Sequence, residues 1–211
     1  WRAVNLIAPG SRSGTIELTD FGRRVADRDI SQTEFAAITV QTFRLPNPQV
    51  QPSGECEEWL KHGLIIYPLK LILEIECELL KKNEGYITTE ELVRIVIPLS
   101  GCHAELQDYV NFILWHREGS IDISGWPDCA PAANDIRIAR EYLLFLSNYG
   151  YIEKKSGHTR MNEQFFVCDY LVDEINQILS QNIKQESLLD ILQKMRLEKV
   201  ADEVERKRVQ T

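Results

Sequence analysis

The sequence predicts a mainly α-helical protein that carries small β-hairpins. Apolar residues recur at intervals of three and four along most of the chain, which is the period of helices that bury one face. Short extended runs come in two pairs, at positions 4–18 and 151–167, and each pair flanks a loop that contains glycine and serine. Hydrophobic residues make up 44% and charged residues 27% of the 211, which is the composition of a globular protein able to bury a core.

Residues 1–54 are predicted to contain the closing part of a first winged-helix domain. Two strands, Val4–Ile7 and Thr15–Leu18, form its hairpin, and a helix at 21–26 follows, capped by Thr19 or Asp20. A strand, a loop and a strand that ends in the pattern xLTxxGRxV are typical of the end of such a domain, where the hairpin is the wing. The helices that should come first are missing ahead of Trp1, so we expect this first winged helix to be truncated.

The remainder of this segment is predicted to be one helix and a linker. Ser31 and Glu34 have the spacing of a capping box, which predicts a helix over 30–44. Pro46 and Pro48 end that helix, because each lacks an amide proton and keeps its predecessor out of the helical region. The polar stretch that follows, up to Gly54, is the linker candidate.

Residues 55–183 are predicted to form a second, complete winged helix, best placed at about 64–168. The expected elements are a helix opening at Pro68, an extended segment at 85–88, a helix from Thr88 or Thr89 to about Pro98, a helix at 104–117, a helix at 131–149, and a hairpin of 151–155 with 164–167. This is the winged-helix order with one extra helix before the recognition helix. We therefore expect a tandem winged-helix (helix-turn-helix) architecture, followed by a helical connector at 184–211.

The net charge of −8 argues against a free-standing nucleic-acid-binding protein, but the charges are unevenly distributed. Residues 55–91 hold nine acidic and four basic side chains. Residues 1–28 and 131–160 each hold five basic and three acidic side chains, so each region carries +2. Basic side chains therefore gather in the two regions that contain the predicted wings.

The five cysteines are widely spread and contain no CxxC pair, which favours small buried thiols in a reducing cytoplasm over disulfides. Cys102 and His103 with Cys129 match no zinc-ligand spacing, so no metal site is predicted. The apolar-rich run at 64–75 is interrupted by charges and is too short to span a membrane. We expect a cytoplasmic protein that has no membrane partner.

No catalytic centre is predicted in this segment. The chain has no nucleophile arrangement and no phosphate-binding glycine loop. A PD-(D/E)xK nuclease centre holds Mg²⁺ with acidic residues and a lysine at strand ends. Pro127–Asp128 with Glu153–Lys154 does not meet that requirement, because the last two are adjacent and no predicted strand carries Asp128. No cofactor is therefore expected here.

The helix at 131–149 has the composition of a DNA-reading element. Apolar residues recur at helical spacing and should face the core, at Ile136, Ala139, Leu143 and Leu146. This leaves Asn134, Arg137 and Arg140 facing outward near the start of the helix. In a winged helix this part enters the major groove, where arginine reads guanine and asparagine reads adenine through paired hydrogen bonds. The alternative is an ordinary solvated face on which Arg137 pairs with Glu141. Both interpretations stay open on the sequence alone.

The two wings carry candidate ligands for DNA phosphates. They are Lys154, Lys155, His158 and Arg160 in the second wing and Ser11, Arg12 and Ser13 in the first. Basic side chains on exposed turns are common, so no one of these residues is specific by itself.

The order of these elements resembles the recognition region of type IIS restriction and nicking endonucleases of the AlwI/BstNBI kind. The resemblance covers residues 4–183 and runs from IELTDFGRRVAD and SQTEFAAITVQTFRLPNP through YPLKLILEIECELL and ITTEELVRIVIPLSG to NDIRIAREYLLFLSNYGYIEKK and FFVCDYLVDEINQIL. It implies recognition of double-stranded DNA by the helix at 131–149 and by both wings. It also implies a Mg²⁺-dependent nuclease domain beyond Thr211, which would supply the cleavage.

Two hypotheses of different classes follow. The first is a sequence-specific, double-stranded DNA recognition segment of a restriction-type endonuclease, in a restriction–modification or anti-phage setting, whose nuclease domain or subunit lies outside this chain. The second is a winged-helix scaffold that mediates protein–protein contacts in a prokaryotic defence or regulatory complex. The acidic stretch at 55–91 and the amphipathic segment that contains Leu188 and Leu192 motivate the second.

Overall fold

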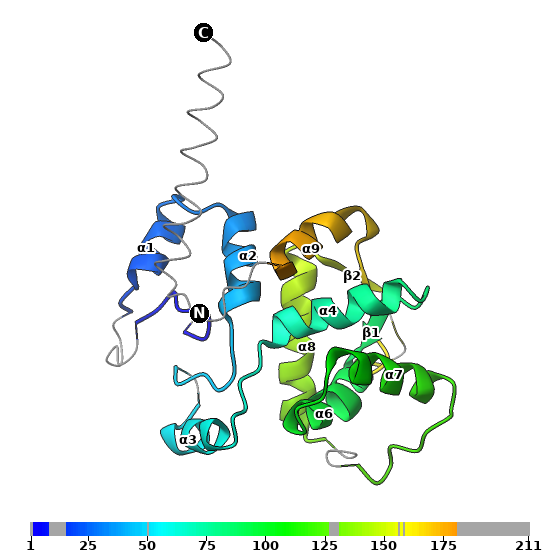
Figure 1. Cartoon of the computed structure of the whole chain (residues 1–211). Helices are drawn as coiled ribbons and strands as arrows, with labels where there is room; N and C mark the ends of the chain where they lie inside the picture. Colours follow the sequence, from blue (N-terminus) through cyan, green and yellow to red (C-terminus); the bar gives the residue numbers. More distant parts are fainter. Residues whose placement is uncertain are drawn as a thin grey trace.

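The computed structural model describes residues 2–8, 16–49, 51–126, 131–155, 157 and 159–180. In this part of the chain, helices pack around one small antiparallel sheet (Figure 1). The prediction of a mainly helical fold is therefore confirmed. The connector predicted at 184–211 lies outside the described residues. No helix in the described ranges is long and apolar enough to cross a membrane.

The sheet has three strands, β1 (Tyr86–Thr88), β2 (Ile152–Lys155) and β3 (Gln164–Val167), in the order β1-β3-β2. β2 and β3 form the hairpin that the sequence predicts, with Ile152 opposite Val167. β1 pairs with the other edge of β3, with Ile87 opposite Phe165. Because neighbouring side chains on a strand point to opposite faces, Phe165 and Val167 lie together on the buried face of the central strand.

The order of the helices around this sheet is compatible with the winged helix that the sequence predicts. They are α4 (Pro68–Leu80), α5 (Thr89–Glu91), the π-helical η1 (Leu92–Val96), α6 (Ile97–Gly101), α7 (Leu106–Arg117), α8 (Ala133–Asn148), the 3-10 helix η2 (Asp169–Leu171) and α9 (Val172–Ser180). α7 is the extra helix, and α8 is the one that directly precedes the hairpin. α8 contacts α4, α5, η1 and β2, so it lies at the centre of this unit (Figure 1).

The chain passes Pro98 without leaving the helical conformation, whereas the sequence predicts a helix end there. The Ile97 amide donates to the carbonyl of Leu92, five residues back, in the wide turns of η1. A proline placed directly after such a turn interrupts no regular i→i−4 bond, so its missing amide proton costs little. α6 therefore continues to Gly101.

In the N-terminal segment, residues of the LTDFG pattern at 18–22 contact the chain at 2–8 and so hold α1 (Asp20–Ala26) against it. Leu18 pairs with Ile7 in a single antiparallel bridge. The Thr19 hydroxyl accepts from the Gly22 amide at 2.8 Å and donates to the Asn5 carbonyl at 2.6 Å. A Cβ on Gly22 would lie 2.1 Å from the Leu6 carbonyl oxygen, so only glycine permits this approach. Residues 9–15, which complete the predicted hairpin, lie outside the described ranges.

The predicted helix at 30–44 is α2 (Gln32–Thr42), and its capping box of Ser31 and Glu34 is confirmed. α2 packs into two hydrophobic clusters. Its Phe35 and Ile38 belong to a small N-terminal cluster, and its Ala36 and Val40 belong to the main core. This N-terminal segment is therefore packed directly against the rest of the molecule.

A further helix, α3 (Ser53–Lys61), begins within the stretch that we predicted to be a linker. Its N-cap is Pro52, which supplies no side-chain hydrogen bond, and its sequence carries few apolar residues. Neither a start signal nor a clear apolar period therefore indicates the helix. Leu45 pairs with Ile66 in an isolated bridge, which brings the two ends of the α3 region together.

Glu76 is a buried carboxyl in the main core, on the face of α4 that also carries Ile72 and Leu73. Its side chain is 0% exposed, and neither carboxyl oxygen has a hydrogen-bond partner within the described residues. Burial raises the pKa of Glu76 well above its ordinary value, against the opposing charge of Arg117. Burial therefore favours the neutral form of this carboxyl over the charged one.

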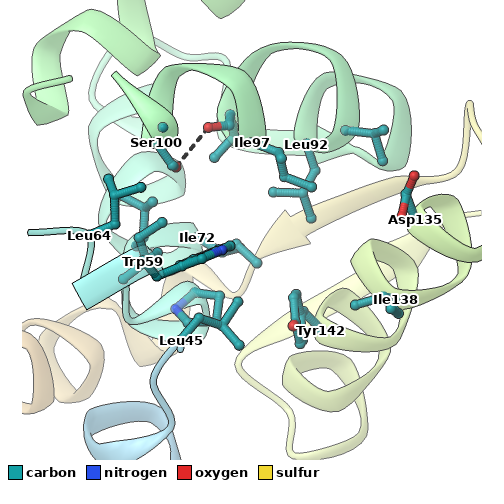
Figure 2. Close-up of a pocket in the computed structure, with 16 residues that line it drawn as sticks. Leu45, Trp59, Leu64, Ile72, Leu92, Ile97, Ser100, Asp135, Ile138 and Tyr142 are labelled. Atoms are coloured by element: carbon teal, nitrogen blue, oxygen red, sulfur yellow. Dashed lines mark hydrogen bonds between the residues drawn. The ribbon is translucent and has the colours of Figure 1, made fainter. Parts of the chain in front are cut away.

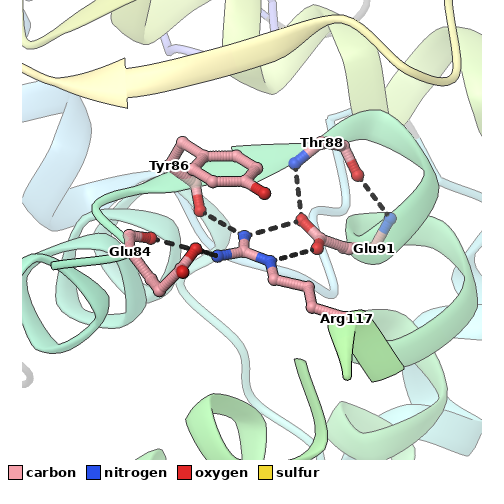
Figure 3. A network of polar contacts seen from close by, with 5 residues as sticks. All are labelled: Glu84, Tyr86, Thr88, Glu91 and Arg117. Atoms are coloured by element: carbon pink, nitrogen blue, oxygen red, sulfur yellow. Dashed lines mark hydrogen bonds and ion pairs between the residues drawn. The ribbon is translucent and has the colours of Figure 1, made fainter. Parts of the chain in front are cut away.

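A polar network centred on Arg117 fastens the extra helix to the sheet (Figure 3). The Arg117 guanidinium donates to Glu91 Oε1 at 2.7 Å and to the Tyr86 carbonyl at 2.7 Å, and it lies 3.8 Å from the Tyr86 ring centroid. Glu91 also accepts from the Thr88 amide, in the capping box that begins α5. Arg117 thus joins the end of α7 to β1 and to the start of α5.

Candidate nucleic-acid interface

α8 presents an apolar face to the core and a polar face to solvent, as the sequence predicts. Ala139, Leu143 and Leu146 are each 0% exposed. Asp135 lies in the first turn of the helix, and its carboxylate accepts from the Ala132 amide at 3.1 Å. An acidic side chain in the first turn also interacts favourably with the helix dipole. The first turn of α8 is therefore capped, and its first two turns are open to solvent on one side.

Arg137 and Asn134 lie on the solvent side and contact each other. The Arg137 guanidinium donates to Asn134 Oδ1 at 2.9 Å and to Glu141 Oε1 at 2.5 Å. The side chains of Arg137 and Glu141 are 58% and 57% exposed, so this ion pair is worth at most about 0.5 kcal/mol. The Arg137–Glu141 ion pair, which was the alternative interpretation of this helix face, is therefore present. A ligand can separate the two side chains at small cost in free energy.

Arg140 has a different environment from Arg137. Its guanidinium forms two hydrogen bonds with Glu163, at 2.5 and 3.0 Å. The Lys154 ammonium reaches the same carboxylate at 2.8 Å. The side-chain exposures of Arg140, Lys154 and Glu163 are 22%, 34% and 12%. These three residues, which we call the Glu163 triad, join α8 to β2 and to the chain just before β3.

The electrostatics of the Glu163 triad keep its carboxylate charged. Hydrogen bonds from Arg140 and then from Lys154 lower the pKa of Glu163 to about 2, although burial acts in the opposite direction. The sequence gives no indication that Glu163 belongs to this site, because it stands in the turn before a strand and 23 residues from Arg140. The available signal was that Glu163 is the one acidic residue in the loop 156–163 of the sequence, which also carries His158 and Arg160.

Lys154 and Lys155 point to opposite faces of the sheet. Lys154 is opposite Phe165 and shares its face, on the side of α8. Lys155 lies on the other face, with its Nζ atom 3.8 Å from the ring centroid of Phe166. Two lysines that are adjacent in sequence therefore cannot both face a ligand that lies on the α8 side.

The turn that leads into β3 places Arg160 on the surface. Thr159 Oγ1 donates to Asn162 Oδ1 at 2.8 Å, and the Glu90 amide of α5 donates to the Met161 carbonyl at 3.0 Å. Arg160 is exposed. The other candidates of the wings, His158, Ser11, Arg12 and Ser13, lie outside the described residues.

The net charge of this surface is small. Residues 133–167 contain five basic side chains, Arg137, Arg140, Lys154, Lys155 and Arg160, and four acidic ones, Asp135, Glu141, Glu153 and Glu163, which gives +1. The described residues contain no group of three side chains that could hold a metal ion, and Cys129 is outside them. The chemistry that this surface offers is hydrogen bonding and charge pairing.

The comparisons with known proteins give one structural match. No protein-family model and no curated protein matches the sequence. Among solved structures, the chain is similar to the BpuJ1 endonuclease binding domain, crystallised in complex with pyrene- and phenanthrene-modified DNA, with a TM-score of 0.60 at 13% sequence identity. The match covers 88% of this chain and 66% of that one, so this chain spans just under two thirds of its length. The two chains share a fold.

Proposed function

We propose that this chain recognises double-stranded DNA through the start of α8 and the adjoining wing, as the recognition part of a restriction-type endonuclease. The observation that carries the proposal is the shared fold with a restriction endonuclease binding domain in complex with DNA, over 88% of this chain. α8 corresponds in order to the recognition helix of a winged helix, and its exposed face carries Asn134 and Arg137. Membership of the AlwI/BstNBI group stays a prediction from the sequence resemblance.

In this proposal, Arg137 and Asn134 read bases. Both are exposed at the start of α8, and their mutual hydrogen bond of 2.9 Å sets the guanidinium beside the amide. Arginine pairs with guanine, and asparagine with adenine, through two hydrogen bonds in the major groove. Arg137 would leave Glu141 to do so, which costs little because that pair is exposed.

The other candidates divide into two roles. Arg140 and Lys154 hold the wing in place through Glu163, and they leave one net positive charge for phosphates. Arg160 would contact phosphates directly, together with His158 and with Ser11, Arg12 and Ser13 of the first wing. Lys155 would reach only a phosphate that lies beyond the opposite face of the hairpin from α8. We propose that 1–54 and 55–183 act as tandem winged-helix units. Cleavage, with the Mg²⁺ that it requires, would belong to a nuclease domain or subunit outside this chain.

The proposal is tested by binding. A random-sequence duplex pool is carried through repeated rounds of selection on the immobilised chain, and the enriched duplex is then titrated by filter binding at two salt concentrations. We expect enrichment of one sequence and an affinity that falls as salt rises, because phosphate contacts release counterions. Enrichment of no sequence, or an affinity that does not change with salt, would overturn the proposal.

Variants locate the interface. Arg137→Ala should raise the Kd for the enriched duplex by about 5- to 100-fold. Arg137→Lys should recover only part of the lost affinity, because lysine cannot form two parallel hydrogen bonds to one base. Lys61→Ala is the matched control, since it removes one exposed charge from α3, outside the proposed interface. Equal losses in Arg137→Ala and Lys61→Ala would show that α8 does not read the DNA.

A further inference from the structure

An apolar cavity of about 360 Å³ opens between α3, α4, the continuous η1–α6 helix and the start of α8. Figure 2 shows Trp59 of α3 in the middle of the labelled side chains, with Leu92 and Ile97 on one side and Ile138 and Tyr142 of α8 on the other. Three helical segments between residues 53 and 101, together with α8, thus supply its walls. Several of the lining residues, among them Ile72, Leu92 and Val93, also belong to the main core.

The polar groups of the cavity are few. The Ser100 hydroxyl is already engaged, because it donates to the Val96 carbonyl at 2.7 Å and accepts from Tyr109 at 3.3 Å. Within the described residues, the Trp59 indole N–H and the Tyr142 hydroxyl have no hydrogen-bond partner. Burial raises the pKa of Tyr142 to about 12, so its hydroxyl stays neutral. Each of these two groups is free to bond to a ligand.

Charge and size restrict what the cavity can hold. Asp135 contributes an exposed carboxylate to the lining, which disfavours an anion. A cavity of about 150 Å³ lined by aliphatic and aromatic side chains holds one benzene molecule. The present volume is more than twice that, which corresponds to two or three aromatic rings. It also lies in the range of about 300–1,000 Å³ that is typical of small-molecule sites.

We infer that this cavity is a binding site for an uncharged aromatic molecule of two or three rings that carries a hydrogen-bonding group. The apolar walls would enclose the rings, and Trp59 and Tyr142 would bond to the polar atom. This site is separate from the base-reading residues Asn134 and Arg137, which do not line it. Its occupancy can therefore be measured without DNA.

The test uses the neutral probe N-phenyl-1-naphthylamine, whose fluorescence rises and shifts to the blue in an apolar site. The full chain is titrated with the probe in the absence of DNA, and we expect saturable binding of one molecule per chain. Gly101→Trp is the blocking variant, because Gly101 lines the cavity and a Cβ there meets no atom within 4 Å. We expect it to lower the probe affinity at least about tenfold, since the indole occupies the same volume.

Gly125→Trp is the matched control. A Cβ at Gly125 also meets nothing within 4 Å, and the residue does not line the cavity. Urea unfolding of both variants shows that each is folded before the titration. Unsaturable binding to the native chain, or equal affinities in the two tryptophan variants, would overturn the inference. Because no step involves DNA, this outcome is independent of whether the proposed DNA recognition holds.

Discussion

Replacing Glu163 by glutamine removes the charge that holds α8 and the wing together. The carboxylate binds the Arg140 guanidinium at 2.5 and 3.0 Å and the Lys154 ammonium at 2.8 Å. Glu163→Gln keeps the shape of the side chain, so the change isolates the charge. Two cations are then left facing each other across a neutral amide.

The magnitude follows from the pKa of Glu163. The fall from 4.5 to about 2 corresponds to about 3 kcal/mol of stabilisation of the ionised form in the folded protein. Arg140 and Lys154 are partly exposed, at 22% and 34%, so solvent compensates for part of this loss. We expect Glu163→Gln to lower the free energy of unfolding at pH 7 by about 2 kcal/mol.

The difference between the native chain and Glu163→Gln should depend on pH. Because folding depresses this pKa, the stabilisation is complete above the unfolded value near 4.5 and is lost as the pH falls toward 2. Urea unfolding of both proteins between pH 7 and pH 2 measures this difference in the free energy of unfolding. The control is Glu141→Gln, which breaks an exposed pair on the same helix and should cost at most about 0.5 kcal/mol. The expectation is refuted if Glu163→Gln loses no more free energy of unfolding than Glu141→Gln, or if its loss does not change with pH.

Three further predictions concern the core. Arg117→Lys should lower the free energy of unfolding by about 3 kcal/mol in urea titrations, because lysine cannot bond to Glu91 and to the Tyr86 carbonyl in the same geometry. Glu76→Gln should raise the melting temperature at pH 8 and change it little at pH 4. The reason is that the raised pKa of Glu76 makes the folded state lose stability as the pH rises above about 4.5. An equal change of the melting temperature at both pH values would contradict this. Phe165→Ala should cost about 3–5 kcal/mol, since the side chain is 0% exposed in the central strand, and a loss below about 1 kcal/mol would show that the sheet is not packed as described.

The elements that the sequence predicted are those with a local chemical signal. Thr19, Ser31 and Thr88 begin helices through side-chain hydrogen bonds to the backbone. The sequence indicated Ser31 directly, and it indicated Thr19 and Thr88 each as one of two neighbouring candidates. The period of α8 likewise placed Ala139, Leu143 and Leu146 in the core. Such features depend on residues three or four positions apart, which is why a pattern reveals them.

The features that the sequence did not predict depend on distant residues or on a missing signal. α3 begins after Pro52 with no side-chain cap, and β1 joins β3 from nearly eighty positions away in the sequence. The bond between Arg140 and Glu163 is equally non-local, so helix periodicity shows Arg140 near the surface but not its partner. The opposite directions of Lys154 and Lys155 were predictable from the alternation of a strand, once the register was known.

The three successive charges of β2 also protect the protein from self-association. Among the strands that the structure describes, β2 is an outer one, with β3 on one side and no described strand on the other. Such an edge can pair with another molecule, and charged side chains, lysine in particular, oppose that pairing. Glu153, Lys154 and Lys155 are all exposed along this edge. Variants that neutralise these lysines are therefore better made with glutamine or serine than with valine or isoleucine. A β-branched residue on the edge strand would promote aggregation. In a binding assay, that aggregation would look like a loss of DNA binding.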